Sequence, residues 1–409
     1  MLRRNVISIT LLAAIAALAP ASAVSAERHN GDTVIVKYRF GATPGERSSL
    51  DERVGVGPVV ERVRAVGATV ARVDGDPAHV AARLERSAKV AYAEPDDIVR
   101  AAGAKPADPR FKHQWALHNT GQTGGRTDAD IDAPAGWMQL GLGSFPSTGG
   151  VPIGVIDTGI DQGHPDLEGR VTGCKSFYRD EPGDTCVDDN GHGTHVAGIA
   201  GARTDNQRGI AGVAFNSPLL VCRAIGGPGT ATGKASDVAG CIDWLHDQGA
   251  GVINMSLQGG RSETLRRAVR QAWSGGDQTG ALLVAAAGNG GFSTAAYPAS
   301  FAQVISVGAT TDRDERAAFS TRNEDVELAA PGDDILSTWP GERYEVESGT
   351  SMASPYAAGV AAHIRGTRPD ARAARVRVLF QKAVDDLGPK GRDTSFGFGR
   401  VNLADAPGG

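Results

Sequence analysis

The chain has 409 residues, of which 41% are hydrophobic and 22% are charged, with a formal net charge of −5. This length suffices for one large domain and one small domain. The charge balance provides neither a polycationic surface for nucleic acid nor a polybasic patch for a membrane, so we expect neither partner in the mature protein.

The first 26 residues have the three parts of a secretory signal peptide. Arg3 and Arg4 precede an apolar run from Val6 to Leu18, and Ala-Ser-Ala at 21–23 offers a cleavage site, with a second at 24–26. The run is short for a membrane span, which makes a membrane anchor the weaker alternative. We predict a signal peptide over residues 1–26 and a secreted, extracellular protein.

Residues 27–100 have the pattern of a small α/β unit, with room for one weak extra strand. The predicted elements are strands at 32–40, 68–75 and 89–97 and helices at 47–66 and 77–88. The segment 100–109 that follows is rich in Ala, Pro and Gly and has no periodicity, which indicates a linker.

In residues 101–409, nearly uninterrupted apolar runs alternate with helical segments. The predicted strands are 151–157, 217–225, 251–257, 281–289, 304–310 and 326–332, and the helices include 191–202, 235–249 and 262–274. Such runs are typical of parallel strands that are covered on both faces. The alternation predicts a three-layer, doubly wound α/β domain with a mostly parallel sheet.

Four cysteines lie in this second domain, namely Cys174, Cys186, Cys222 and Cys241. In an exported chain an even number of cysteines favours disulfides, and the lack of a CxxC pair argues against zinc. Of the three possible connectivities we expect the sequential one, which closes short loops.

Four polar residues stand where a sheet of this kind gathers functional groups, at strand ends and the helix starts that follow them. Asp157 and Asn289 end strands, whereas His192 and Ser351 begin helices. Taken singly, Ser351 is more often a helix cap, Asn289 is usually a turn residue, and Asp157 is as often a strand-end cap as a functional group. Together they could supply a serine nucleophile, a histidine base, a carboxylate that orients the imidazole, and an amide donor to an oxyanion.

The segments VIDTGID…HPDL, GHGTHVAG and GTSMASP resemble the three active-site motifs of the subtilisin-like serine peptidases, or subtilases, in the order of that family. The resemblance covers about residues 108–403. Two further segments, WALHNTGQTGG and GVAFNSPLLVCRAI, are similar to the thermitase and proteinase K branch. It implies a serine endopeptidase with Ser351 as nucleophile, His192 as base, Asp157 as orienting acid and Asn289 as oxyanion donor.

His195 follows His192 by three residues, and this spacing could also bind a metal. The segment lacks the Glu of an HExxH motif, and a metal site would need a third ligand. The resemblance therefore assigns the chemistry to His192 and leaves His195 to pack beneath it. The small residues Gly198, Ala200 and Gly201 are expected to let this helix approach the helix of Ser351.

Two rival functions remain open at this point. GTSMA is close to the GxSxG turn of α/β-hydrolase esterases, but the only histidine after Ser351 is His363, which lies well along an apolar helix. The other rival is a binding protein on the same fold without catalysis.

The resemblance extends, through weaker motifs, to the N-terminal unit. Residues 27–100 resemble the inhibitory propeptide of the family, which occupies the active cleft of its own chain and assists folding. An unrelated fused binding module is the alternative. Cleavage would fall between Arg100 and Asp108, and residues 101–409 would form the mature, monomeric enzyme.

The resemblance also implies structural Ca²⁺. One strong site would use the side chains of Asp108, Asp166 and Asn206 and the backbone oxygens of Arg208 and Ile210, a set of oxygen ligands that suits a hard cation. A second, weaker cation site could use Asp325, Glu327 and carbonyls at 299–304.

Three segments are expected to offer backbone edges to an extended polypeptide substrate: 226–233, 256–260 and 285–289. By resemblance, Ser256, Leu257 and Gly259 form the first pocket wall, in which Gln258 replaces the usual glycine, and Ala287 and Gly288 belong to the facing segment. No acidic residue falls in these segments, so we expect broad cleavage after apolar or aromatic residues rather than after paired basic residues.

Overall fold

The computed structural model describes residues 32–96, 104–180, 183, 185–276, 279–291 and 294–406. The chain divides into two compact units, Met1–Val99 and Arg100–Gly409, which are described separately. The predicted signal peptide, residues 1–26, and the stretch 97–103 lie outside the described residues. Within the described part of the chain, no helix combines the length and the apolar character needed to cross a membrane.

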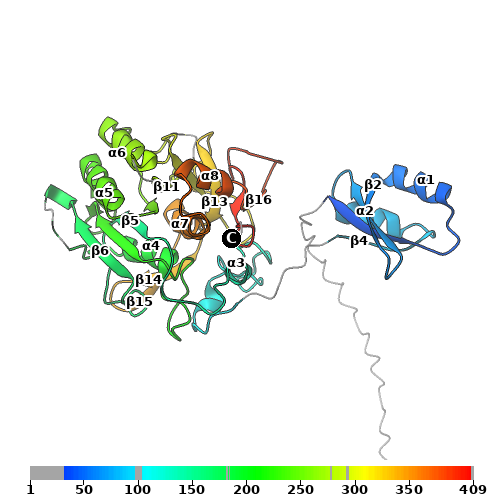
Figure 1. Cartoon of the computed structure of the whole chain (residues 1–409), viewed down its shortest axis with the longest axis horizontal. Helices are drawn as coiled ribbons and strands as arrows, with labels where there is room; N and C mark the ends of the chain where they lie inside the picture. The colour runs from blue at the N-terminus through cyan, green and yellow to red at the C-terminus, as the bar shows by residue number, and fades with distance from the viewer. Residues whose placement is uncertain are drawn as a thin grey trace, which may run out of the picture. The chain divides into compact units, whose positions relative to one another are not determined.

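The first unit is a four-stranded antiparallel sheet, in the order β2-β3-β1-β4, with two helices packed on one face (Figure 1). Its elements are β1 (Thr33–Tyr38), α1 (Pro44–Val54), β2 (Val56–Val63), β3 (Ala68–Val73), α2 (Pro77–Glu85) and β4 (Val90–Pro95). Leu50 of α1 and Leu84 of α2 meet Val34 and Val36 of β1 in the core.

The helix predicted at 47–66 is wrong in its second half. The helix begins after Thr43, whose side chain and that of Glu46 form a capping box, and it ends at Gly55, which has φ of 83°. Only glycine adopts such a left-handed conformation readily, so the chain turns there. The following residues, VGPVVERV, are rich in β-branched side chains and pair with β3 as the extra strand.

The second unit has the predicted three-layer α/β architecture around a nine-stranded sheet, in the order β16-β17-β13-β12-β11-β10-β5-β7-β6. All neighbouring strands are parallel except β16, which is antiparallel to β17. The strands are β5 (Ile153–Asp157), β6 (Val171–Ser176), β7 (Leu219–Arg223), β10 (Val252–Met255), β11 (Leu282–Ala286), β12 (Val304–Thr310), β13 (Val326–Pro331), β16 (Val384–Asp385) and β17 (Arg400–Val401).

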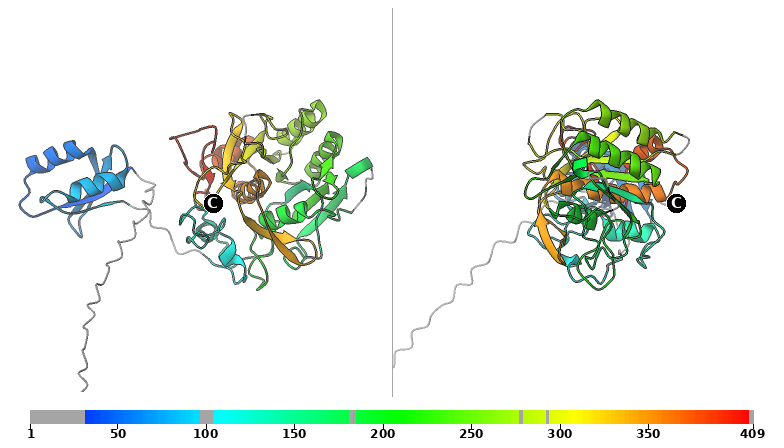
Figure 2. Two further views of the ribbon diagram at one scale, coloured as in Figure 1. Left: turned by 180° about the vertical axis from the view of Figure 1, so that it is seen from behind. Right: turned by 90° about the vertical axis from the view of Figure 1, so that its left-hand side faces the viewer.

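Helices cover both faces of this sheet. They are α3 (Ala133–Gln139), α4 (His192–Gly201), α5 (Ala235–Asp247), α6 (Glu263–Ser274), α7 (Thr350–Gly366) and α8 (Ala373–Phe380). Successive side chains of a strand point to opposite faces: Leu282 and Val284 of β11 join the core of α4 and α7, whereas Leu283 and Ala285 join the core of α5 and α6. Figures 1 and 2 show these layers from three directions.

Two hairpins lie outside the main sheet. β8 (Ile225–Gly226) pairs with β9 (Thr232–Gly233), and β14 (Ile335–Trp339) pairs with β15 (Arg343–Glu347). Side chains of β14 attach this second hairpin to α4, because Ser337 Oγ donates to the carbonyl of His195 and Thr338 Oγ1 donates to that of Thr194.

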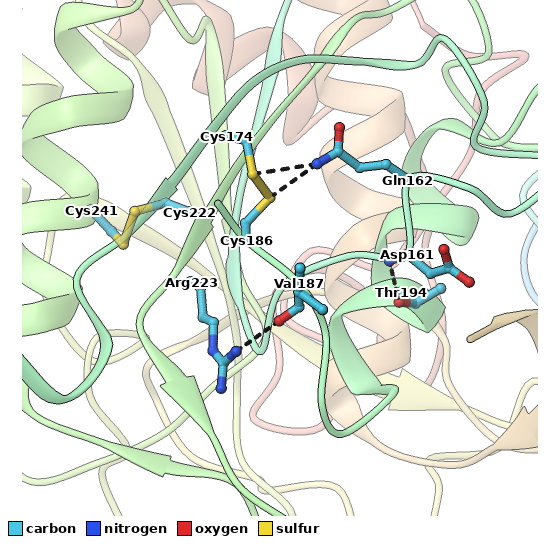
Figure 3. Close-up of a disulfide and its surroundings, with 9 residues drawn as sticks. All are labelled: Asp161, Gln162, Cys174, Cys186, Val187, Thr194, Cys222, Arg223 and Cys241. Atoms are coloured by element: carbon cyan, nitrogen blue, oxygen red, sulfur yellow. Dashed lines mark hydrogen bonds between the residues drawn. A yellow bond between two sulfur atoms is a disulfide. The ribbon is translucent and has the colours of Figure 1, made fainter. Parts of the chain in front are cut away.

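Both disulfides have the sequential pairing (Figure 3). Cys174 of β6 is bonded to Cys186 in the loop that leads to α4, and Cys222 of β7 is bonded to Cys241 of α5. The first bond thus attaches a loop to an edge strand of the sheet, and the second attaches a helix to a neighbouring strand.

Candidate active site

Asp157 and His192 meet where β5 ends and α4 begins. Oδ1 of Asp157 accepts hydrogen bonds from Nδ1 of His192 at 2.7 Å and from the backbone N–H of Thr158 at 2.8 Å. The Asp157 side chain is fully buried, whereas that of His192 is 28% exposed. Because Nδ1 donates to the carboxylate, Nε2 of the neutral ring carries the lone pair.

The surroundings of His192 have opposing effects on its pKa. Burial lowers the pKa, while the charge of Asp157 and its hydrogen bond raise it, and the charges of Asp188 and Glu347 add to the rise. The net result is a pKa above the ordinary value for histidine. A carboxylate in contact with the imidazole is the expected cause of such a rise.

Ser351 lies in the first turn of α7 and faces the end of β10. Its Oγ donates to the carbonyl of Ser256 at 3.3 Å, and Oγ of Ser256 donates back to the carbonyl of Ser351 at 2.7 Å. Beneath them, Ser354 Oγ donates to Asn254 Oδ1 at 2.6 Å, and Asn254 Nδ2 donates to Ser256 Oγ at 3.0 Å. This buried network, whose members Asn254 and Ser354 the sequence analysis missed, holds the start of α7 against the sheet.

Asn289 follows the end of β11, and its amide has a determined orientation. Its Oδ1 accepts from the backbone N–H of Thr350 at 2.9 Å and from Oγ1 of Thr350 at 2.8 Å. Because a backbone N–H can only donate, the amide oxygen must point to Thr350, and Nδ2 is not used in this contact. Gly349, which precedes α7, lies close to this nitrogen, since a Cβ atom built on it would be 3.2 Å away.

His192, Ser351 and Asn289 line one cleft of about 580 Å³. The predicted pocket residues Ser256, Leu257, Gln258, Gly259 and Gly288 also line it, together with residues 229–235. The side chains of Val238, Leu265 and Tyr297 add apolar surface, and no Asp or Glu among the described residues lines the cleft.

One predicted pocket residue lies elsewhere, and the structure shows how Gln258 affects the pocket. Ala287 does not line the cleft: it is buried, its N–H donates to the carbonyl of Val307, and Ala286 and Gly288 face the cleft instead. Gln258 extends toward the facing segment, since its Oε1 lies 2.7 Å from the position of a Cβ on Gly288. The glutamine side chain therefore narrows the pocket between the two walls.

His195 is fully buried behind the cleft and takes no part in it. Its Nε2 lies 3.0 Å from the carbonyl of Ile335 and 3.2 Å from that of Glu345, so it joins the two strands of the β14–β15 hairpin. Burial lowers the pKa of His195 to about 3, which keeps the ring neutral. The expectation that Gly198 allows close approach to the Ser351 helix is wrong, because a Cβ there would overlap Thr338 of β14.

The predicted ligands of the strong Ca²⁺ site lie together. Asp108 accepts from the N–H groups of Asp205 at 2.7 Å and Asn206 at 3.0 Å. Asp166 accepts from Asn206 Nδ2 at 3.0 Å and from the N–H of Ile210 at 2.9 Å. Arg208 lies in the same loop, and its N–H donates to Asn206 Oδ1 at 2.8 Å.

The electrostatics of this loop fit a cation. Burial raises the pKa of Asp108, and the charges of Asp166 and Asp205 add to the rise. The two N–H donors lower the pKa, but the net value is still raised to about 6. Asp108 and Asp166 are thus buried carboxylates that repel each other, and a bound cation would relieve that repulsion. Among the described residues, no three or more His, Cys, Asp or Glu side chains are grouped as for a metal ion, so amide and carbonyl oxygens would have to complete the shell.

The second, weak cation site is not supported. Glu327 accepts from Nε of Arg377 at 2.7 Å and from Nε2 of Gln381 at 2.8 Å. Nη1 of Arg377 also donates to the carbonyl of Ala302 at 2.6 Å. The guanidinium of Arg377 thus binds both Glu327 and the carbonyl segment 299–304, which were expected to share a cation.

Comparison with known protein families gives two matches. Residues 148–399 match the Subtilase family, and residues 15–96 match the family described as Fervidolysin N-terminal prodomain. The N-terminal unit is therefore a prodomain, and its match is separate from that of the larger unit.

Individual relatives agree with these matches. A thermophilic serine proteinase from Bacillus sp. (strain AK1) is 38% identical over 377 residues, which are 91% of this chain and 86% of the relative. Thermitase from Thermoactinomyces vulgaris is 40% identical over 273 residues, 66% of this chain and 91% of thermitase. A solved protease structure from Pseudoalteromonas arctica PAMC 21717 has a TM-score of 0.63 at 28% identity and covers 74% of this chain and 98% of that one. These matches show that the chain belongs to the subtilase family of serine peptidases.

Proposed function

We propose that the protein is a secreted serine endopeptidase that cleaves polypeptides through Asp157, His192 and Ser351. The observation that carries this proposal is the 2.7 Å hydrogen bond between buried Asp157 and His192 beside a cleft that Ser351 also lines. Labelling with a serine-reactive phosphonate, followed by peptide mapping, tests it. The label is expected on Ser351, and a protein that stays unlabelled would be a binding protein rather than an enzyme.

In the proposed reaction, Ser351 Oγ turns from the Ser256 carbonyl and attacks the carbonyl carbon of the peptide, while Nε2 of His192 takes its proton. Asp157 stabilises the imidazolium that forms. The same proton passes to the leaving amine, and water then hydrolyses the acyl-enzyme.

Two donors serve the oxyanion in this proposal. Nδ2 of Asn289 is not used in the contact with Thr350, because the amide oxygen accepts both of those hydrogen bonds. The N–H of Ser351 belongs to the first turn of α7, where backbone N–H groups lack partners within the helix. Both are positioned before reaction, which is the arrangement that stabilises developing charge most effectively.

The cleft favours an apolar or aromatic residue before the scissile bond. Leu257, Ala286 and Tyr297 supply apolar surface, and no acidic side chain among the described residues lines the cleft to attract a basic one. The rival esterase reading has no support, since His363 is buried on α7 with Nε2 2.9 Å from the carbonyl of Val213.

The chain organisation is proposed on the same basis. A signal peptide over 1–26 directs export, residues 27–100 act as an inhibitor within the chain, and residues 101–409 form the monomeric enzyme. Cleavage between Arg100 and Asp108 releases the mature protein.

Proteolysis is expected to fall at acid pH. Only neutral His192 can accept the serine proton, and its pKa lies above the ordinary value of about 6.5, so activity should decline while the pH is still near neutral. The measurement is kcat/KM for a peptide substrate from pH 5 to 9. A flat profile across this range would exclude His192 as the base.

A Ca²⁺ ion is proposed at Asp108, Asp166 and Asn206, with the carbonyls of Arg208 and Ile210. The ion would neutralise the two buried carboxylates and fix the loop between α4 and β7 to the N-terminal part of the catalytic unit. It has no part in the proposed reaction.

Removal of this ion by EDTA should lower the melting temperature. An ion present at a hundred times its Kd stabilises the native state by about 2.7 kcal/mol, which corresponds to a shift of about 4 °C for a unit of this size. Calorimetry with and without EDTA measures the shift. Asp108→Asn should abolish the response, while Asp325→Asn, at the unsupported second site, should retain it. A wild-type melting temperature that EDTA does not change would rule out the strong site.

A further inference from the structure

The loop before α4 contains a carboxylate that accepts five hydrogen bonds. Oδ1 of Asp188 accepts from Oγ1 of Thr158 at 2.8 Å and from the N–H groups of Asn190 at 3.0 Å and Gly191 at 2.8 Å. Oδ2 accepts from the N–H of Thr194 at 2.9 Å and from its Oγ1 at 2.6 Å. Asp188 therefore joins the strand end that bears Asp157 to the helix start that bears His192.

The two threonines continue this connection on both sides. Thr158 donates its N–H to Asp157 at 2.8 Å, and its Oγ1 accepts from the N–H of Gly193, beside His192, at 2.8 Å. Oγ1 of Thr194 accepts from the N–H of Asp161 at 3.0 Å. Each hydroxyl thus donates to Asp188 and accepts from the opposite segment, so the carboxylate orients both.

The segments that Asp188 joins are in direct contact. A Cβ atom on Gly193 would overlap the carbonyl of Gly159, so the first turn of α4 lies against the loop after β5 with no side chain between them. At this separation, a shift of Asp188 would change the distance between Asp157 and His192.

The loop that carries Asp188 is itself anchored (Figure 3). The disulfide bonds Cys186 to β6, the carbonyl of Cys186 accepts from the N–H of Ile160 at 2.7 Å, and Nη1 of Arg223 donates to the carbonyl of Val187 at 2.8 Å. Figure 3 shows Cys186 bonded to Cys174, the Val187 carbonyl facing Arg223, and Asp161 beside Thr194 of α4. Asp188 thus presents its acceptors from a fixed backbone.

The charged groups near His192 come from three elements. Asp157 ends β5, Asp188 precedes α4 and Glu347 ends β15, while neutral His195 lies one turn further along α4. Burial by itself raises the pKa of Asp188, but the hydrogen bonds together lower it by more. The net pKa lies below the ordinary value, so the carboxylate is charged near neutral pH. Its charge therefore acts on His192 in addition to its hydrogen bonds.

We propose that Asp188 is a positioning residue, which acts through Thr158 and Thr194 to hold His192 against Asp157. This role rests on the proposed reaction but is separable from it, because Asp188 holds and polarises His192 without contacting the reacting groups.

Asp188→Asn tests the proposal. An amide of the same size has one acceptor atom, so its NH₂ group must oppose backbone N–H groups of either Thr194 or Asn190 and Gly191. We expect kcat per phosphonate-labelled site to fall at least about tenfold with little change in KM, since small misplacements of catalytic groups have large effects. The acid limb of the pH profile should also move to lower pH, because a negative charge near His192 is lost.

Asp189→Asn is the matched control. It changes the net charge equally at the next residue, but Asp189 is 46% exposed and pairs with Arg223 at 2.7 Å rather than with α4. Its kcat should stay within about threefold of wild type, with a smaller shift of the acid limb, as expected for a screened surface charge. Equal kcat and equal acid limbs in Asp188→Asn and wild type would overturn the proposal.

A second pair of variants decides the matter if Asp188→Asn does not fold. Thr158→Val, which loses both hydrogen bonds of the hydroxyl, should show the drop in kcat, whereas Thr158→Ser, which keeps them, should stay near wild type. Equal kcat in these two variants would contradict the role of Asp188. Failure of the proposed function would differ from either outcome, because wild type itself would then resist the phosphonate label.

Discussion

Replacement of Ser351 by alanine is expected to abolish proteolysis while the fold is retained. Among the described residues, Ser351 Oγ makes a single long hydrogen bond, at 3.3 Å to the Ser256 carbonyl, so removal of one oxygen should cost the folded state little. The loss of the proposed nucleophile should lower kcat by about 10⁶-fold, the size found for the corresponding change in subtilisin. Peptide hydrolysis and circular dichroism measure the two effects.

The same variant should also fail to mature. If the enzyme cuts its own linker, Ser351→Ala should be secreted as one chain that begins near residue 24 or 27, while wild type begins between Ala101 and Asp108. N-terminal sequencing distinguishes the two, and added wild-type enzyme should cut the variant, which would show that the linker is accessible. Normal maturation of the pure variant, with no other protease present, would refute both self-processing and the role of Ser351.

Alanine at His192 and at His195 is expected to have opposite effects. His192→Ala should be folded and inactive, with a loss comparable to that of Ser351→Ala, because no further His and no Asp or Glu among the described residues lines the cleft to accept the serine proton. Its melting temperature should change little, since His192 lines the cleft and water can enter to hydrate Asp157.

His195→Ala should instead destabilise the protein. The change leaves a cavity against Trp339 and removes the donor to the carbonyls of Ile335 and Glu345, with an expected loss of about 2–4 kcal/mol. Thermal unfolding and kcat, measured on both variants, provide the comparison. An active His192→Ala would overturn the proposed base, and an unchanged melting temperature in His195→Ala would show that the hairpin is held by other contacts.

The alternation of apolar runs and helical segments was sufficient to predict the architecture of the large unit. Strands such as β12, VISVGAT, are buried on both faces. Burial on both faces favours an almost uninterrupted run of apolar residues, which can be recognised in the sequence. The positions of Asp157, His192, Ser351 and Asn289 were also accessible, because each lies at the end of a strand or the start of a helix within a distinctive local motif. The sequential pairing of the cysteines, expected because it closes short loops, is confirmed.

Other features depended on which distant segments meet. Gly198 packs against β14, whose position beside α4 no local pattern reveals. Arg377 of α8 takes the place of the second cation because it reaches Glu327 across the fold. Gly55, which ends α1, allowed a strand where helical periodicity had suggested more helix.

Asp188 is the clearest case of this limit. In the sequence it is one acidic residue beside another, Asp189, and nothing local separates the two. The tertiary structure gives one of them five donors between β5 and α4 and leaves the other beside Arg223 at the surface. A carboxylate acquires such a role only from the donors that the fold brings to it, so sequence determined the residue type and tertiary contact determined its use.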